Sequence, residues 1–132
     1  MRVVLDSNVW LAVLTNNGFC RRVWRAARNQ SRFIVSQEIL DEVAEKLRAK
    51  FGFSPRHAGL MTYFVRQQAE FGSAVSKIAA CRDADDNLIL AAALDSKCSH
   101  LITGDSDLLD LKHFQDISII TPREFFELIS KT

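Results

Sequence analysis

Short apolar runs alternate along this chain with longer segments in which apolar residues recur every three or four positions. A short run bounded by turn residues is typical of a buried strand, and the longer spacing is typical of a helix with one buried face. The short runs predict strands at 2–5, 33–35, 74–78, 100–103 and 117–120. The periodic segments predict helices at 9–14, 19–30, 37–47, 55–71, 85–94 and 124–129.

The order of these elements indicates the fold class. Strands and helices alternate from one end of the chain to the other, and the sequence shows no repeat, low-complexity stretch or linker. Alternation of this kind is typical of an α/β domain with a mostly parallel central sheet and helices on both faces. At 132 residues the chain is long enough to bury a core of its own. We therefore expect one three-layer domain over residues 1–132.

An acidic cluster marks the start of the predicted helix at 85–94. Asp83, Asp85 and Asp86 lie within four residues and are followed by the most apolar segment of the chain, 88–94. One aspartate is a common N-cap, but two carboxylates about 5 Å apart repel each other by about 3 kcal/mol at an effective dielectric constant of about 20. A solvated acidic cap and a cation site both remain open, and the crowding favours the cation.

Two other predicted strands also end in acids. Asp6 follows the strand at 2–5, and Asp105 and Asp107 follow the strand at 100–103. Because the carboxyl ends of parallel strands share one edge of the sheet, we expect these side chains to converge with the acidic cluster. Carboxylate oxygens suit Mg²⁺ and Mn²⁺, which need neither His nor Cys ligands. The sequence therefore predicts a site for one or two such ions.

Several other classes of chemistry lack the residues that they need. The histidines are scattered singly, the cysteines lack metal-ligand spacing, and there is no glycine-rich phosphate loop. What remains is metal-assisted hydrolysis, for which a phosphodiester is the natural substrate. The chain has no run of 18 apolar residues and no signal peptide, so we expect a cytoplasmic protein that does not enter a membrane.

Basic and aromatic residues leave further alternatives open. The formal net charge is only +1, so nucleic-acid binding would require a local patch. Arg21, Arg25 and Arg28 share one side of the predicted helix at 19–30. This stripe fits a solvated face, which we favour, or a contact to RNA phosphates. The aromatic residues of the region 51–71 are expected to pack in the core and in a helical hairpin rather than to stack on bases.

Four segments of the chain resemble, in order, the motifs of PIN-domain ribonucleases. The resemblance extends over essentially the whole chain, and it is closest to the bacterial and archaeal branch similar to VapC toxins of toxin–antitoxin pairs. Each motif alone is weak, whereas four in the correct order are specific. The matching segments are Val3–Val9, Ser36–Val43, Cys81–Asn87 and Leu101–Asp107, followed by Ile120–Phe125.

This resemblance implies a PIN-like fold, an endoribonuclease activity and a set of site residues. The catalytic and metal-binding residues that it implies are Asp6, Glu42, Asp86 and Asp105, with Asp107 as a further metal ligand. The supporting residues are Asn8, Asp83 and Thr103. The motif alone selects Glu42, because periodicity does not distinguish it from the neighbouring acids.

The resemblance also implies partners, namely an RNA substrate, a cognate antitoxin protein and a second copy of the chain in a homodimer. The sequence departs from the usual pattern of this branch at Ala84, where proline is common, and at Asn87, where aspartate is common. Neither departure replaces one of the four catalytic acids.

Two other functions compete with the ribonuclease. A catalytically silent PIN-like module that binds RNA or a protein would not require the four acids, which are all present. A phosphatase of the haloacid dehalogenase type would begin with a similar strand and Asp6, but it needs a second acid where Asn8 stands. Metal-dependent nuclease activity distinguishes the three.

Overall fold

The computed structural model describes residues 1–131 and contains one six-stranded sheet. Its strands are β1 (Arg2–Leu5), β2 (Arg32–Val35), β3 (Glu70–Phe71), β4 (His100–Ile102), β5 (His113–Phe114) and β6 (Ile117–Ile120). Their order is β3-β2-β1-β4-β6-β5, and every neighbouring pair is parallel except β5 with β6. The predicted mostly parallel sheet is confirmed, although the short strand β5 was not predicted.

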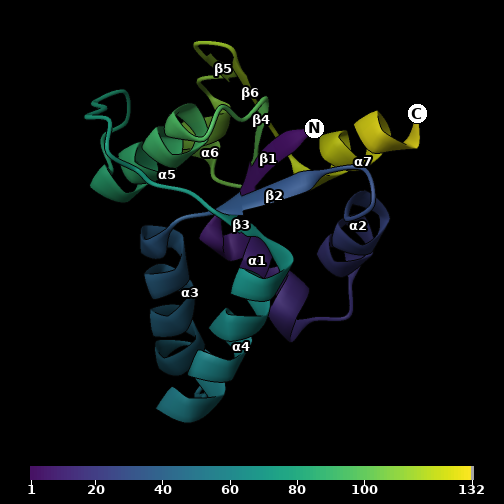
Figure 1. The fold of residues 1–132 in the computed structure, drawn as a ribbon, viewed down its shortest axis with the longest axis vertical. Helices are drawn as coiled ribbons and strands as arrows, with labels where there is room; N and C mark the ends of the chain where they lie inside the picture. Colours follow the sequence, from purple (N-terminus) through teal and green to yellow (C-terminus); the bar gives the residue numbers. More distant parts are fainter. Residues whose placement is uncertain (132) are drawn as a thin grey trace.

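Helices cover both faces of this sheet (Figure 1). The helices are α1 (Ser7–Thr15), α2 (Phe19–Ala27), α3 (Gln37–Ala49), α4 (Pro55–Gln68), α5 (Ala84–Asp95), α6 (Ser106–Leu109) and α7 (Pro122–Ser130). Helix α5 packs against β1, β2 and β4, whereas α1 to α4 lie on the opposite side of the sheet. Helix α7 packs against α2. No helix among residues 1–131 is both long and apolar enough to cross a bilayer.

The buried strands and the buried helix α5 form the core, and the start of α5 lies at one edge of the sheet. Val3, Val4 and Ile34 in the central strands are fully buried, as β-branched residues in a sheet covered on both faces should be. The run Leu90–Ala93 of α5 is equally buried, so this helix lies in the core. Its first turn reaches the sheet edge, where Asp83 accepts a hydrogen bond from the Asp85 N–H at 2.9 Å and caps the helix.

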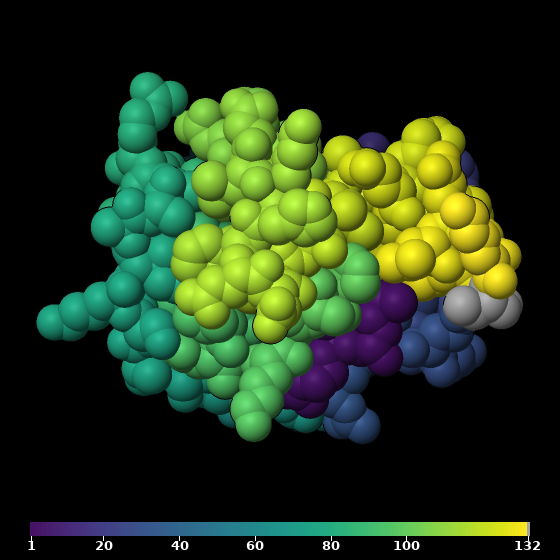
Figure 2. All heavy atoms as spheres, turned by 90° about the horizontal axis from the view of Figure 1, so that it is seen from above, coloured from purple at the N-terminus to yellow at the C-terminus, as the bar shows by residue number. Residues whose placement is uncertain are grey.

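The strand predicted at 74–78 is wrong. Helix α4 ends at Gln68, earlier than expected, and the chain joins the sheet at β3 instead. The N–H groups of Val75 and Ser76 donate to the Asp95 carboxylate at 2.7 and 2.8 Å, so they are not available for a strand ladder. In the space-filling view the teal segment between β3 and α5 stands out from the surface (Figure 2).

The aromatic residues of the region 51–71 are more exposed than we expected. Phe51, Tyr63, Phe64 and Phe71 are 46%, 64%, 39% and 42% exposed, whereas Phe53 is half-buried and stacks on the His57 ring. Core packing is therefore wrong for these four, although Phe51 contacts the Phe53 ring and Phe64 contacts the buried Trp24 ring. The hairpin of α3 and α4 is held by smaller buried residues instead, among them Val43, Leu47, Ala58 and Val65.

Candidate functional site

The carboxyl ends of β1 and β4 bring the first acids together. Leu5 and Ile102 are partners in the parallel β1–β4 ladder, and the next N–H group, that of Asp6, donates to the Ile102 carbonyl at 3.0 Å. Asp6 is only 3% exposed, and its Oδ1 accepts a hydrogen bond from the Val9 N–H at 3.0 Å, which caps α1. The buried strand therefore delivers a fixed carboxylate to the sheet edge.

Three further acids converge beside Asp6. Carboxylate oxygens of Asp86, Asp105 and Asp107 all lie within 4.8 Å of one another. Asp86 is buried on the first turn of α5, Asp105 is half-buried after β4, and Asp107 is exposed on α6. Asp105 is held in place by accepting the Asp107 N–H at 2.9 Å. A buried helix start and a strand end thus present one group of oxygen ligands.

Thr103 connects this group to Asp6. Its buried hydroxyl donates to Asp6 Oδ2 and accepts the Asp105 N–H at 3.0 Å. The same hydroxyl therefore holds the Asp6 carboxylate and the backbone of Asp105. The sequence predicts Thr103 as a supporting residue, and these two hydrogen bonds are the means by which it would support the site.

Burial and nearby negative charges oppose the ionisation of two of the acids, Asp86 and Asp6. Burial, followed by the charges of Asp105 and Asp83, raises the pKa of Asp86 to about 7. Burial also raises the pKa of Asp6, although its hydrogen bonds from Thr103 and the α1 backbone oppose the rise. The crowding anticipated from the sequence therefore costs free energy in the metal-free protein.

Glu42 and Asn8 stand on a different wall of the site. Glu42 is on α3 and is not a member of the three-carboxylate group, but its charge contributes to the raised pKa of Asp6, so the two lie near each other. Lys46 Nζ is 3.1 Å from Glu42 Oε1 and donates to Asn8 Oδ1 at 3.1 Å. The four acids selected by the motif are therefore not equivalent, because only Glu42 already has a cation beside it in an ion pair among residues 1–131.

The two positions that depart from the usual motif have separate consequences. The Asn87 side chain accepts the Cys81 N–H at 2.8 Å and donates to the Cys81 carbonyl at 3.0 Å. An aspartate could not make the second bond, so Asn87 closes the loop before α5. Ala84 begins α5 and is exposed, and nothing around it requires a proline.

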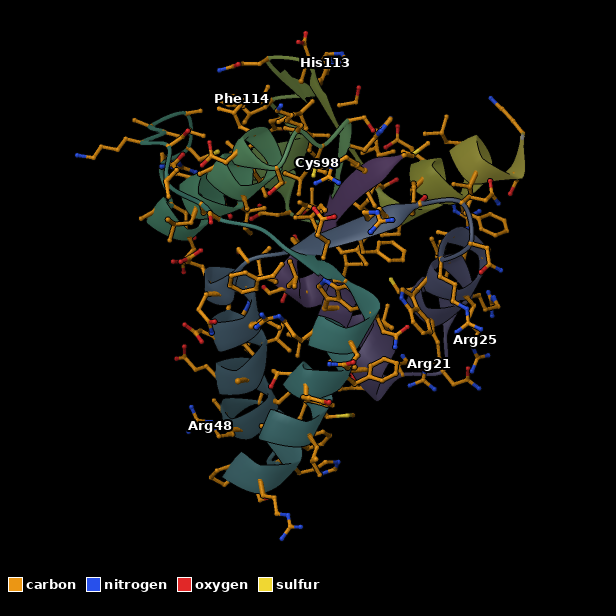
Figure 3. The ribbon with its side chains drawn as sticks, viewed as in Figure 1. Arg21, Arg25, Arg48, Cys98, His113 and Phe114 are labelled. Atoms are coloured by element: carbon orange, nitrogen blue, oxygen red, sulfur yellow. The ribbon has the colours of Figure 1, made fainter. Side chains whose placement is uncertain are left out.

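The arginine stripe lies away from the acids. Arg21 donates to the carbonyls of Val13 and Leu14 at 2.8 and 3.1 Å and so satisfies the end of α1. Arg28 lies over the Trp24 ring, 5.4 Å from its centroid, and Arg25 is exposed. Figure 3 shows Arg21 and Arg25 on the side of the molecule opposite α5. Whether these arginines bind RNA stays a prediction.

The donor set fits a hard divalent cation. Asp86, Asp105 and Asp107 offer oxygen atoms only, at spacings that one ion could bridge, and no cysteine or histidine belongs to the group. An ion there would offset the repulsion that raises the pKa of Asp86. Mg²⁺ and Mn²⁺ suit these ligands, and the residues that could hold them are the three aspartates, with Asp6 adjacent through Thr103.

Two side chains at the site were not predicted. Lys46 carried the signal of an i, i+4 pair with Glu42, but its contact with Asn8 joins residues 38 positions apart. Arg82 Nη2 lies 3.6 Å from Asp107 Oδ2, and its 90% exposed side chain makes this a weak surface pair. Neither tertiary contact has a pattern in the sequence that reveals it.

Comparisons with known proteins identify the family of this chain. Residues 2–107 match the family described as PIN domain. The chain is 30% identical to an uncharacterised protein of Methanocaldococcus jannaschii, over 99% of this chain and 93% of that protein. It is thus similar to a protein that matches it over nearly its full length.

Solved structures share the fold. VapBC2 from Rickettsia felis, bound to a DNA fragment from its promoter, superposes with a TM-score of 0.68 at 11% identity, covering 92% of this chain and 98% of that chain. VapBC-1 from nontypeable Haemophilus influenzae superposes with a TM-score of 0.65 at 13% identity, covering 93% of this chain and 99% of that chain. The Sarcin-Ricin loop cleaving toxin VapC20 of Mycobacterium tuberculosis superposes with a TM-score of 0.60 at 13% identity, covering 88% of this chain and 98% of that chain. Together with the match over residues 2–107, these results show that the chain belongs to the PIN domain family.

Proposed function

We propose that this chain is a metal-dependent endoribonuclease that hydrolyses RNA phosphodiester bonds. The observation that carries the proposal is the convergence of Asp86, Asp105 and Asp107 within 4.8 Å at the carboxyl edge of a parallel sheet. Membership of the PIN domain family supports a nuclease, and the oxygen-only donor set supports Mg²⁺ or Mn²⁺ as the cofactor. Asp6 and Glu42 complete the proposed set of catalytic acids.

The chain's own residues have distinct tasks in this reaction. A bound divalent cation would supply polarisation of the scissile phosphate and activation of a water. The Thr103 hydroxyl orients the Asp6 carboxylate by donating to it and holds the Asp105 backbone by accepting its N–H, so it keeps these two residues together. The Asp86 carboxyl, whose pKa is raised to about 7, is about half protonated at neutral pH, and its protonated form must release the proton before it can act as a charged ligand.

An RNA cleavage assay tests this function. Chelator-treated protein should cut RNA after addition of Mg²⁺ or Mn²⁺, should remain inactive in EDTA, and should respond poorly to Zn²⁺. Asp105→Asn should abolish cleavage while the protein stays folded, because asparagine replaces aspartate well as the cap of α6. The exposed Asp110→Asn is the matched control and should retain activity. Full activity in excess EDTA would exclude the metal mechanism, and inactivity of folded protein with every ion would favour the silent module.

We further propose that the chain is the toxin of a toxin–antitoxin pair and forms a homodimer. The likeness to VapBC structures supports this role, as does an exposed apolar face on α4. Leu60 and Tyr63 are 60% and 64% exposed there, and a cavity of about 270 Å³ between α2 and α4 is lined by Trp24 and Phe64. Apolar patches of this kind are typical of surfaces that a partner covers.

Growth and mass measurements test the second proposal. Expression of the wild-type chain should arrest bacterial growth, and co-expression of a small protein encoded beside it should restore growth. Asp105→Asn should not arrest growth. Light scattering during gel filtration should give twice the 14.9 kDa chain mass. A monomer, or arrest that persists with Asp105→Asn, would contradict the respective part of the proposal.

A further inference from the structure

An ammonium group occupies the α3 side of the acidic site. Lys46 Nζ lies 3.1 Å from Glu42 Oε1 and 3.1 Å from Asn8 Oδ1, so it joins α3 to the first turn of α1. The Lys46 and Glu42 side chains are 22% and 24% exposed. An ordinary i, i+4 pair on a helix surface has no need of a third partner from another helix.

The surroundings place this lysine in the site rather than on the outer surface of α3. Asn8 follows Asp6 by two residues, and the charge of Glu42 acts on Asp6. The other basic residues of this part of α3, Arg48 and Lys50, are exposed, and Figure 3 shows Arg48 pointing away from the sheet. Among these basic residues of α3 and its C-terminal end, Lys46 is therefore the one that faces the acids.

We propose that Lys46 supplies the positive charge on the α3 wall, so that the site holds a single divalent ion, on Asp86, Asp105 and Asp107. This inference rests on the proposed function. A second divalent ion on Glu42 would stand against the ammonium, and like charges at such short range repel strongly. The three-carboxylate group meets the needs of one ion without Glu42.

Lys46 also has a free donor for the substrate. An ammonium carries three N–H donors, and the contacts of Lys46 within residues 1–131 are those to Glu42 and Asn8. The third donor is available for a phosphate oxygen of the RNA. Lys46 would then be a substrate-binding residue on the wall opposite the metal ion.

The stoichiometry of Mn²⁺ binding tests the inference. We expect isothermal titration of the metal-free protein to give one ion for the wild type and for Lys46→Arg. Lys46→Met should bind two ions, because it frees Glu42, and the double variant Lys46→Met/Glu42→Gln should return to one. Lys50→Met, which removes an exposed lysine from the same helix, is the matched control and should bind one. Lys46→Gln, a neutral side chain that can still donate to Asn8, replaces Lys46→Met if that variant melts at a lower temperature than the control.

Each possible number of bound Mn²⁺ ions supports or overturns a different part of the proposal. Two ions on the wild type, or one ion on both neutral variants, would overturn the role of Lys46 while leaving a metal-dependent nuclease intact. No Mn²⁺ on the wild type would overturn the proposed function as well. In a separate measurement with EDTA, Lys46→Met should weaken binding of an RNA oligonucleotide severalfold relative to Lys50→Met, and Lys46→Arg should restore it. Equal affinities would overturn the substrate contact.

Discussion

Asp86 combines two properties that conflict in the absence of a cation. It is 5% exposed at the start of a buried helix, and it faces Asp105 across the three-carboxylate group. Burial, followed by the charge of Asp105, raises its pKa to about 7. An asparagine at this position would keep the shape and could donate to Asp105 as the protonated acid does. The charge of Asp86 and its structural role can therefore be separated.

Asp86→Asn should stabilise the metal-free protein at neutral pH. In the unfolded chain Asp86 loses its proton near pH 4, whereas in the folded protein it keeps the proton until about pH 7. The folded state thus binds more protons between these values, and wild-type stability falls as pH rises through that window, at about 1.4 kcal/mol per pKa unit at most. Thermal melts in EDTA should show a wild-type melting temperature several degrees lower at pH 8 than at pH 5, and a smaller difference for the variant.

Added Mn²⁺ supplies the control for this prediction. At a hundredfold excess over its dissociation constant it should stabilise the wild type by about 2.7 kcal/mol, and Asp86→Asn should lose most of this gain. Asp85→Asn, an exposed neighbour on the same turn, should behave as the wild type. Equal pH slopes and equal Mn²⁺ responses in the wild type and Asp86→Asn would mean that Asp86 is an uncharged packing residue.

For single residues, the sequence predicted which acids lie together but not the hydrogen bonds that depend on tertiary packing. Asp6, Asp86 and Asp105 could be foreseen because parallel strands end at one edge and a buried helix begins there. Glu42 was selected only by resemblance. The hydrogen bonds of Asn87 to Cys81 and of Lys46 to Asn8 depend on how helices and loops pack, which no local pattern specifies.

The elements show the same division between local and tertiary control. Strands β1, β2 and β6 follow from apolar runs, and α3 follows from its cap Ser36 and its buried stripe. The region 69–80 was mispredicted because its weak apolar pattern does not decide its structure. Gly72 N–H donates to the Val35 carbonyl at 2.8 Å, and the Asp95 carboxylate holds the next turn. Tertiary partners therefore determine where β3 begins and ends.

Two glycine-to-alanine changes should test this difference between elements. A Cβ at Gly72 would lie 2.8 Å from Ile34 Cγ2 and would also collide with Ser96, so Gly72→Ala should destabilise the protein by about 1–3 kcal/mol. A Cβ at Gly59, in the exposed interior of α4, would meet nothing within 4 Å. Gly59→Ala should therefore stabilise the protein by about 1 kcal/mol through helix propensity. Urea denaturation measures both: stabilisation by Gly72→Ala would contradict the packing at β3, and destabilisation by Gly59→Ala would contradict the open space around Gly59.

The whole molecule carries almost no net charge, so its charge pattern decides where RNA can bind. The formal net charge is +1, and the acids gather between α3 and α5, where Glu38, Asp41, Glu45 and Asp85 line a cavity of about 250 Å³. Without a bound cation, these acids would repel RNA phosphates. The arginines of α2 lie on the other side of the molecule (Figure 3).

If the arginine stripe binds RNA phosphates, Arg25→Gln/Arg28→Gln should weaken RNA binding and its salt dependence. Arg21 is left unchanged because it bonds to the end of α1, so its loss would disturb the fold as well as the charge. For single-stranded RNA each lost phosphate contact lowers the slope of log K against log salt by about 0.7, so the double variant should lose about 1.4. Binding is measured in EDTA, which keeps the RNA intact under the proposed mechanism. Arg48→Gln/Lys50→Gln removes the same two charges from the exposed end of α3 and is the charge-matched control. An equal loss in both variants would assign the effect to overall charge, whereas an unchanged slope in Arg25→Gln/Arg28→Gln would return the stripe to the solvated face that its sequence pattern favours.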